Sequence, residues 1–505
     1  MIDLDEIVKK TTATYCHFDF PVGPNEARRL LDQLENHQWV GNGEWRSYPF
    51  ITYEQVWQRF RKHQEMEHRV KQRPISLTAH HDALIYRYYA QYLSNCYEEL
   101  LSQNPAIDRA AVAYRKSVPG MVRSNITVAK AAFDQIAKQD CWVIKGDFEH
   151  FFDCLDHQLL LQAVERLVKD PLRCKECRKV VKQLQRCASI AQQELEQALP
   201  KQKFRRRGNQ WAHNLNRREL GALIHRQPDL LTTRMKGIPQ GTAISAVLAN
   251  IYMLAFDQWL TSILAPYHGS YWRYSDDFLI VIPRQENFAT GQFRDLVIKQ
   301  SEQMNRLAIN SEKTKLLTFD RQVQRFYHDG SQTSLNYLGF NFDGRTVSLT
   351  PKTIYRFQYR SRRSIHRFLS YVDMKERLLR GDMPIHKVRR RVRNGDYYHR
   401  SPNGFEMEKQ VHLGERVSKM TAWQWGQLHA QVVKQAIPAE STPKAAGYQG
   451  RTFLDYAQNA QQAFTHPQAD YQVVILKQVR RIIGRNQRVL AMGVRKAKSW
   501  SRDTE

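Results

Sequence analysis

The sequence predicts an α+β fold with an antiparallel sheet and an extended helical C-terminal region. The sheet is predicted by two apolar extended runs around a short turn at 271–282, and by a third apolar run at 141–147. The helices are predicted by apolar positions that recur with helical spacing at 83–97, 355–380 and 473–492. A chain of 505 residues is long enough for two or three domains that share a sizeable core.

Residues 1–140 are expected to begin with helices. Apolar positions recur up to about residue 65 and include Trp39, Trp45 and Trp57. The segment 83–97 has the pattern of an amphipathic helix. These patterns predict a largely helical N-terminal region.

An acid stands at the end of the apolar run 141–147. This acid is Asp147, and the tandem aromatic pair Phe151 and Phe152 follows it. Carboxylate oxygens are the hard ligands that Mg²⁺ prefers, so a metal site is one interpretation of this strand end. The two aromatic residues are also typical of simple core packing.

A long insertion is expected at about 158–235, before the next recognisable turn. It contains the helix-like stretch 158–199 and the basic run 201–207. The basic run fits contact with nucleic acid, and it fits a solvated basic loop equally well.

A glycine-lined turn enters a helix at 236–250. Gly237, Pro239 and Gly241 punctuate the turn, and apolar positions then recur with helical spacing. Because glycine carries no side chain, the backbone of such a turn can approach a nucleotide closely.

Two adjacent carboxylates, Asp276 and Asp277, occupy the predicted hairpin at 271–282, with Ser275 and Asp276 near its apex. An acidic hairpin tip is often only a solvated turn. The third carboxylate, Asp147, supports a metal interpretation, because carboxylates that clamp two Mg²⁺ ions can promote in-line phosphoryl transfer.

The net charge of +27 indicates a polyanionic partner. From Pro351 onward the chain has 30 Lys and Arg against 12 Asp and Glu, which is a net +18. Basic residues alternate with aromatic ones there, which favours nucleic acid over a membrane. The chain shows no run of eighteen apolar residues and no signal-peptide pattern, so we expect a cytoplasmic protein without a membrane partner.

The cysteine content predicts reduced thiols. Seven cysteines are an odd number in a long chain without a secretion signal. Cys174 and Cys177 form the one close pair, and its spacing favours two cysteines on a helical face over structural zinc.

Taken in order, these motifs resemble the palm motifs of bacterial reverse transcriptases. The resemblance is carried by Asp147 with its aromatic pair, Gly-Ile-Pro-Gln-Gly at 237–241, Tyr-Ser-Asp-Asp at 274–277, Asn-Ser-Glu-Lys-Thr-Lys at 310–315 and Asn-Tyr-Leu-Gly-Phe at 336–340. Weaker matches upstream resemble the fingers motifs, Lys71–Leu77 followed by Asp82, and Ala113–Ser117. The resemblance covers roughly residues 68–345.

The resemblance implies a right-hand polymerase with fingers, palm and helical thumb. It assigns residues 1–140 to N-terminal helices and fingers, 141–345 to the palm with its insertion, and 346–505 to a basic helical thumb and C-terminal region. The thumb is where such enzymes contact phosphates without reading sequence.

The same resemblance implies a metal-dependent catalytic site. Asp147, Asp276 and Asp277 would bind two Mg²⁺ ions, for which Mn²⁺ can substitute, and Asp277 has the less direct role in the family. The residues that would hold the incoming nucleotide are Lys71, Arg73, Phe151, Phe152, Gln240, Gly241 and Lys313.

Several of these residues have assigned roles. Phe152 matches the ring that excludes the ribose 2′-hydroxyl, and Phe151 is either that ring or core. Arg73 and Lys71 would grip the triphosphate, and Gln240 would lie against the nucleotide. Lys313 would neutralise or protonate departing pyrophosphate, although it and Lys315 also fit ordinary surface charges.

Primer and template contacts are implied at five positions. Arg115 would contact template, although a solvated loop is an equal interpretation. Tyr337, Leu338 and Gly339 resemble the hairpin that holds the primer end, and Tyr274 precedes the acidic turn.

The predicted function is an RNA-directed DNA polymerase that makes cDNA from a partner non-coding RNA template with dNTP substrates. The C-terminal extension is most similar to the defence-associated and abortive-infection reverse transcriptases, several of which form homo-oligomers. The alternatives are a group II intron-type enzyme that helps its RNA fold, an untemplated or low-complexity DNA polymerase, and an RNA-binding scaffold without catalysis.

Overall fold

The computed structural model describes most of the chain and divides it into two compact units. It describes residues 2–10, 15–58, 70–115, 123–186, 188–199, 205–207, 210–213, 215–286, 288–311, 314–381, 412–438 and 452–499. The first unit contains Met1–Val118 and Cys141–Thr318, and the second contains Pro119–Asp140 and Phe319–Glu505. The predicted domain boundaries near residues 140 and 345 stay predictions.

The central sheet of the first unit has the strand order β9-β3-β8-β7. Its strands are β3 (Cys141–Asp147), β7 (Ser270–Tyr274), β8 (Asp277–Pro283) and β9 (Lys315–Asp320). β8 pairs antiparallel with both β3 and β7. The antiparallel sheet and the many helices confirm the predicted α+β class.

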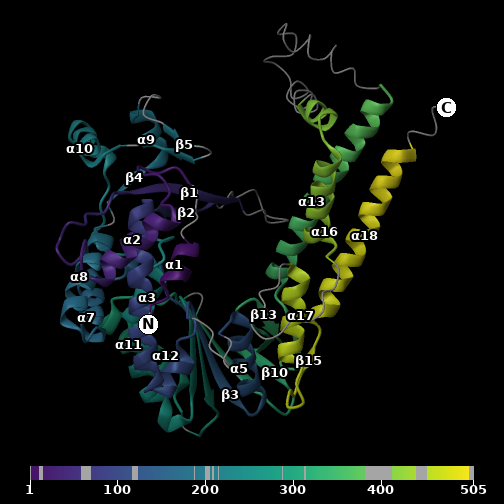
Figure 1. Cartoon of the computed structure of the whole chain (residues 1–505). Coiled ribbons are helices and arrows are strands. Elements are labelled where there is room, and N and C mark those ends of the chain that lie inside the picture. The colour runs from purple at the N-terminus through teal and green to yellow at the C-terminus, as the bar shows by residue number, and fades with distance from the viewer. Residues whose placement is uncertain are drawn as a thin grey trace. The chain divides into compact units, whose positions relative to one another are not determined.

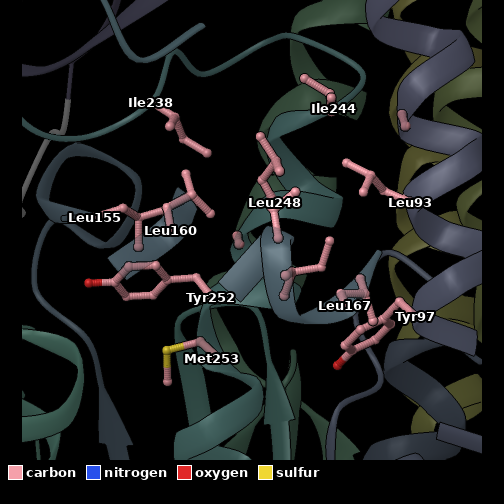
Figure 2. Packing of buried hydrophobic residues seen from close by; sticks show 14 of the residues in the cluster. Leu93, Tyr97, Leu155, Leu160, Leu167, Ile238, Ile244, Leu248, Tyr252 and Met253 are labelled. Atoms are coloured by element: carbon pink, nitrogen blue, oxygen red, sulfur yellow. The ribbon is translucent and has the colours of Figure 1, made fainter. Parts of the chain in front are cut away.

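One face of this sheet packs against helix α11 (Ser245–Leu264). Ile144 of β3 and its cross-strand partner Ile280 of β8 lie in the same buried cluster as Leu248 and Phe256 of α11. Successive strand residues point to opposite faces, so residues 145 and 147 point away from this cluster. Figure 2 shows Leu248, Tyr252 and Met253 of α11 within the core.

The segment Ser245–Tyr267, which begins with α11, is long and apolar enough to cross a membrane by length and composition alone. Asn250 and Asp257 interrupt its apolar residues, so it is not an unbroken apolar run of eighteen residues. Of that apolar window, 56% is buried inside the protein. Its role in the core therefore accounts for its apolar composition.

The N-terminal part of the first unit contains a second sheet as well as helices. Its helices are α1 (Leu4–Lys10), α2 (Pro24–Glu35), α3 (His80–Ser102) and α4 (Pro105–Ala110). α3 confirms the helix predicted at 83–97. The sheet has the order β2-β1-β4, with β1 (Phe50–Gln58), β2 (Val70–Leu77) and β4 (Ser189–Ala191). The helices expected up to about residue 65 are therefore wrong at β1, which finds strand partners on both sides.

The insertion predicted at about 158–235 is mainly helical. It contains α7 (His157–Leu167), α8 (Pro171–Gln185), α9 (Gln192–Ala198) and α10 (Arg217–Arg226), and the hairpin β5 (Arg205–Arg207) and β6 (Gln210–Ala212). α7 follows the short helix α6 (Phe151–Cys154), and α12 (Thr290–Asn305) follows β8. Cys174 and Cys177 both lie on α8, as the helical interpretation predicted, and the six cysteines that the structure describes are free thiols.

The second unit combines short strands with long helices. Its strands are β10 (Arg325–His328), β11 (Ser331–Thr333), β12 (Leu335–Tyr337), β13 (Phe340–Phe342), β14 (Thr346–Leu349) and β15 (Gln472–Val473). Its helices are α5 (Asn125–Ala137), α13 (Pro351–Leu379), α16 (Ala422–Ala436), α17 (Phe453–Phe464) and α18 (Ile475–Ser499). α13 and α18 confirm the helices predicted at 355–380 and 473–492.

Helices α13, α16 and α18 of the second unit lie side by side, as Figure 1 shows. Their apolar faces meet in a cluster that includes Ile365, Phe368, Val432 and Leu490. This packing confirms the predicted helical C-terminal region. The sequence also predicts a dense basic run, Lys-Val-Arg-Arg-Arg-Val-Arg at 387–393, which lies outside the described residues.

Candidate active site

The acidic hairpin has the geometry that the sequence predicts. β7 ends at Tyr274 and β8 begins at Asp277, so Ser275 and Asp276 form the turn. Ser275 has a φ of +63°, a backbone conformation that favours glycine. A serine there costs of order 1–3 kcal/mol, so the surrounding structure must stabilise this turn.

A buried ion pair supplies part of that support. Arg273 of β7 and Asp257 of α11 are both completely buried. The closest distance between a guanidinium nitrogen and a carboxylate oxygen of this pair is 2.6 Å. Burial alone would lower the pKa of the Arg273 guanidinium, but the charge of Asp257 and its hydrogen bonds raise it above its usual value. Arg273 Nη1 also donates to the carbonyl oxygen of Ser275 at 3.3 Å and to Asn250 Oδ1 at 3.2 Å.

The segment 111–114 supports the hairpin from another side. The backbone N–H of Val112 donates to the Arg273 carbonyl oxygen, and Asn250 Nδ2 donates to the carbonyl oxygen of Ala113. Tyr114 OH donates to Ser275 Oγ at 2.9 Å, although half of the Tyr114 side chain is exposed. The acidic turn at Ser275 and Asp276 is thus attached to α11 and to this loop.

Strand register brings two of the predicted carboxylates together. Asp147, the last residue of β3, lies directly opposite Asp277, the first residue of β8. Directly opposed residues project on the same face of a sheet with Cβ atoms about 4.5–5.5 Å apart. The N–H of Phe148 donates to the carbonyl oxygen of Asp276 at 3.1 Å, which joins the turn to the end of β3.

Gly146 permits this close pairing. It lies opposite Phe278, and a Cβ at Gly146 would come within 2.1 Å of the Phe278 ring. The ring packs against Phe148 on the buried side of the sheet. A side chain at position 146 would therefore separate the strands that carry the two acids.

Lys145 contributes positive charge on the face that carries Asp147 and Asp277. Burial lowers the pKa of its amine, and the neighbouring carboxylates of Asp277 and Asp147 oppose that shift. Two like charges so close together repel each other, so a nearby cation stabilises the pair. Lys145 could not be recognised from the sequence, because its place beside the two acids depends on strand pairing.

The donor set suits Mg²⁺ but does not form a complete cage. Among the described residues, no three His, Cys, Asp or Glu side chains gather closely enough to hold an ion by themselves. Mg²⁺ is commonly held by one or two carboxylates together with substrate phosphates and water. The Asp147 and Asp277 pair, with Asp276 beside it in the turn, fits that mode of binding.

The two aromatic residues after Asp147 differ in how deeply they are buried. Phe151 is buried and packs on Phe148, whereas Phe152 is half-buried. The ring of Phe152 meets the ring of Tyr114 edge-on, with 6.5 Å between the centroids. Phe152 is therefore the more accessible of the two rings, and its role as a steric gate stays a prediction.

The Gly-Ile-Pro-Gln-Gly turn joins strand β2 to the loop after β3. The N–H of Ser76 in β2 donates to the carbonyl oxygen of Gln240 at 3.0 Å. Gly241, with a φ of +109°, lies so close that a Cβ would come within 3.1 Å of the Ser76 carbonyl oxygen. The side-chain amide of Gln240 lies 3.5 Å from the carboxylate of Asp153.

The start of this turn is anchored in the core. The N–H of Gly237 donates to the Leu155 carbonyl oxygen, and the N–H of Ile238 donates to that of Phe152. Ile238 is fully buried, and Figure 2 shows it in the same core as Leu155 and Leu160. The turn therefore holds a fixed position relative to Phe152.

Of three predicted nucleotide-binding residues, the structure places two on a strand and leaves the third undescribed. Arg73 and Lys71 lie on β2, opposite Gln55 and Trp57 of β1. Lys313 lies outside the described residues. Its motif begins at Asn310, whose N–H donates to the Asp147 carbonyl oxygen at 3.0 Å, so the motif starts beside the first acid.

Arg115 is buried, although both sequence interpretations expected an accessible side chain. Its guanidinium makes two hydrogen bonds of 2.7 Å to Glu98, pairs with Asp108 and donates to the Ala111 carbonyl oxygen. The nearest carboxylates come from the adjacent helices α3 and α4, a neighbourhood that sequence spacing did not reveal. In this arrangement Arg115 braces the loop that carries Tyr114.

The remaining primer and template residues belong to different units. Tyr274 ends β7 in the first unit, where burial raises the pKa of its phenol. Tyr337 is buried in the second unit, and Leu338 and Gly339 form the turn between β12 and β13. The carbonyl oxygen of Gly339 accepts the N–H of Thr350, the residue before α13. Their primer contacts stay predictions.

The family described as reverse transcriptase (RNA-dependent DNA polymerase) matches residues 60–342 of this chain. The match spans more than half of the sequence and contains all three acids, the glycine-lined turn and the β12–β13 turn. The protein therefore belongs to the reverse transcriptase family. No curated protein matches the chain.

Similar solved structures include three telomerases. A Candida tropicalis telomerase truncated from its C-terminal domain has 14% identity and a TM-score of 0.37, over 59% of this chain and 54% of that one. Candida albicans telomerase in complex with a TWJ fragment of telomeric RNA has 12% identity and a TM-score of 0.37, over 66% and 52%. Apo telomerase of Candida tropicalis has 10% identity and a TM-score of 0.39, over 90% of this chain and 66% of that one. This chain thus spans about half the length of the first two.

Replacing Phe152 by alanine should admit ribonucleotides. Because the ring of Phe152 is half-buried and faces Tyr114, its loss opens space where a 2′-hydroxyl would otherwise clash. We expect discrimination between dNTP and rNTP to fall at least about tenfold, measured as the ratio of kcat/KM values. Phe152→Tyr, which keeps the ring, is the matched control. Unchanged discrimination in Phe152→Ala would assign the ring to the core alone.

Proposed function

We propose that this protein is an active, Mg²⁺-dependent RNA-directed DNA polymerase. The observation that supports this most directly is the strand register that sets Asp147 opposite Asp277, with Asp276 in the adjoining turn. A buried ion pair and a glycine at position 146 maintain this arrangement. Such organised negative charge is costly unless cations or substrate use it.

The proposed reaction joins a deoxynucleotide to a growing strand. A hydroxyl, either the 3′-hydroxyl of a primer or a hydroxyl of a protein, attacks the α-phosphate of a dNTP. The new phosphodiester bond forms as the bond to the β-phosphate breaks and pyrophosphate leaves. Bound Mg²⁺ would supply the charge that activates the hydroxyl and stabilises the leaving group, with Mn²⁺ as a substitute.

The residues of this chain would hold the reactants in place. Asp147, Asp276 and Asp277 would hold the metal, and Phe152 would lie against the sugar. Arg73 and Lys71 on β2 would bind the triphosphate, with Gln240 beside the nucleotide, because the Gln240 backbone is joined to β2. Lys313 would neutralise the negative charge of the departing pyrophosphate or donate a proton to it.

We further propose that the template is a partner non-coding RNA and that the enzyme acts in antiphage defence in the cytoplasm, as a homo-oligomer. The net charge of +18 after residue 350 supports a nucleic-acid partner held by many phosphate contacts. The long helical region of the second unit gives such a partner room beyond the catalytic site.

Sequencing of the co-purifying nucleic acids tests this function. The full-length protein and Asp276→Asn would be purified from the native host, and all bound RNA and DNA would be sequenced. One dominant small RNA, with complementary DNA in the wild type alone, would support the proposal and identify the template. An intron RNA would favour the intron-type alternative, and DNA without a complementary RNA would favour untemplated synthesis. RNA without carboxylate-dependent DNA, even after phage infection, would contradict catalysis.

A further inference from the structure

The first half of α13 presents an unusual exposed face. Between Pro351 and Arg367 every Lys and Arg side chain is exposed, and this stretch contains no Asp or Glu. The basic residues are Lys352, Arg356, Arg360, Arg362, Arg363 and Arg367. The first acid of the helix is Asp373, so the positive face is separated from the helix's own negative charges.

Four of these arginines line a groove. Arg356, Arg360, Arg363 and Arg367 recur at helical spacing and face Gln431, Lys434 and Gln435 of α16. The groove has a volume of about 890 Å³ and reaches Leu338 and Gly339 at one end. Its described lining contains no carboxylate, and within the described residues these four arginines form no ion pair.

Two exposed tyrosines flank the arginine row. Tyr355 and Tyr359 are 60% and 50% exposed, and their rings stack with 6.4 Å between centroids and an interplanar angle of 22°. Each precedes a groove arginine by one residue. At the far end of the groove, a second hollow shares Arg367 and Lys434 and includes Arg416, Lys419 and Trp423. Trp423 is 72% exposed.

Exposed aromatic rings beside a row of arginines are suited to unpaired nucleotides. Bases of a single strand can stack on tyrosine or tryptophan, while the arginines bind the phosphates that connect them. Within a duplex the base faces are covered by their neighbours, so rings on a helix surface cannot reach them. From residue 355 to residue 371 the helix extends roughly 24 Å, enough for several nucleotides of one strand.

We propose that this face, made of Tyr355, Tyr359, the four groove arginines and Trp423, binds single-stranded RNA. The inference rests on the proposed function in one respect: RNA is chosen because the family copies RNA. Residues 382–411 carry seven Lys and Arg against four Asp and Glu, so their net charge has the same sign as this face and does not complement it. The groove would then hold an unpaired part of the RNA close to the Gly339 turn.

Fluorescence anisotropy on the full-length protein tests this inference. The probe is a labelled RNA of about 12 nucleotides without self-complementarity, compared with the same sequence as DNA and as an RNA duplex. The variants are Tyr355→Ala/Tyr359→Ala and the matched control Tyr355→Phe/Tyr359→Phe, which keeps both rings. Both residues are exposed and alanine favours helix, so the alanine variant should fold normally.

We expect the alanine variant to bind single-stranded RNA about tenfold or more weakly, and the phenylalanine variant to bind it like the wild type. Duplex binding should change less than about twofold. Arg363→Ala should reduce the salt dependence of binding by about one unit of slope, because a phosphate contact is lost, and the alanine variant should leave that slope unchanged.

Several outcomes would overturn the inference. Unchanged affinity of the alanine variant would do so, and equal losses in the alanine and phenylalanine variants would mean that the hydroxyls contact phosphates instead. An equal loss of duplex binding would make the face a duplex surface, and a loss confined to DNA would exclude RNA. Primer extension by each variant keeps the two proposals separate. Ring-dependent RNA binding without any synthesis would leave this inference standing and remove the proposed function.

Discussion

Asp276→Asn is expected to lower nucleotide incorporation about a thousandfold or more, because the loss of a metal ligand removes several kcal/mol of transition-state stabilisation. Asn keeps the size of the side chain, so the turn between Tyr274 and Asp277 should keep its backbone. RNA binding should therefore stay within about twofold of wild type. The measurements are single-turnover incorporation of a dNTP on a primed RNA and anisotropy with the same RNA.

A matched control is available on α12. Asp295 is exposed and belongs to the same unit, and its nearest cation is the neighbouring Arg294. Asp295→Asn changes the net charge by the same amount and should leave incorporation unaffected. A joint loss of RNA binding and incorporation in Asp276→Asn would contradict the metal role and indicate a damaged fold.

The second large effect is expected at the buried pair of Asp257 and Arg273. Asp257→Leu leaves the Arg273 guanidinium buried without its carboxylate, which should destabilise the protein by about 3–5 kcal/mol. Urea or thermal unfolding measures this change. Arg273→Met combined with Asp257→Leu should recover most of that stability, because an apolar pair can replace a buried ion pair.

Activity should not recover with stability. The double variant lacks the hydrogen bond from Arg273 to the Ser275 carbonyl oxygen, so the turn that carries Asp276 loses a support. We expect a lower kcat with a higher requirement for Mg²⁺ and an unchanged KM for dNTP. Full activity in the stable double variant would limit Arg273 to a role in folding.

The sequence predicted the elements that depend on strong local patterns. The hairpin of β7 and β8, the helix α11 and the helices α13 and α18 all have long apolar runs or clear periodicity. Strand β1 was missed because its aromatic residues recur with a spacing that is typical of a helix. Its backbone pairing with β2 and β4 makes it a strand instead.

The supports of the site could not be predicted from spacing. Arg273 is sixteen residues from Asp257, and Tyr114 is far from Ser275 in sequence, so contacts that arise only on folding define their roles. Arg115 was interpreted as an accessible basic residue for the same reason. Its carboxylate partners come from α3 and α4 and are themselves partly exposed, so the burial of the guanidinium between them is a property of the packed loop.

The opposition of Asp147 and Asp277 also limits how the gene can change in length. A strand presents alternate residues to alternate faces, so one inserted or deleted codon in β3, in β8 or in the turn between β7 and β8 would move an acid to the face that packs on α11. Such indels should be eliminated during descent, whereas substitutions that keep the pleat can accumulate. The hairpin therefore tolerates no change in its length. Relatives should differ in length at their surface loops, while the number of residues in β7, β8 and their turn stays constant.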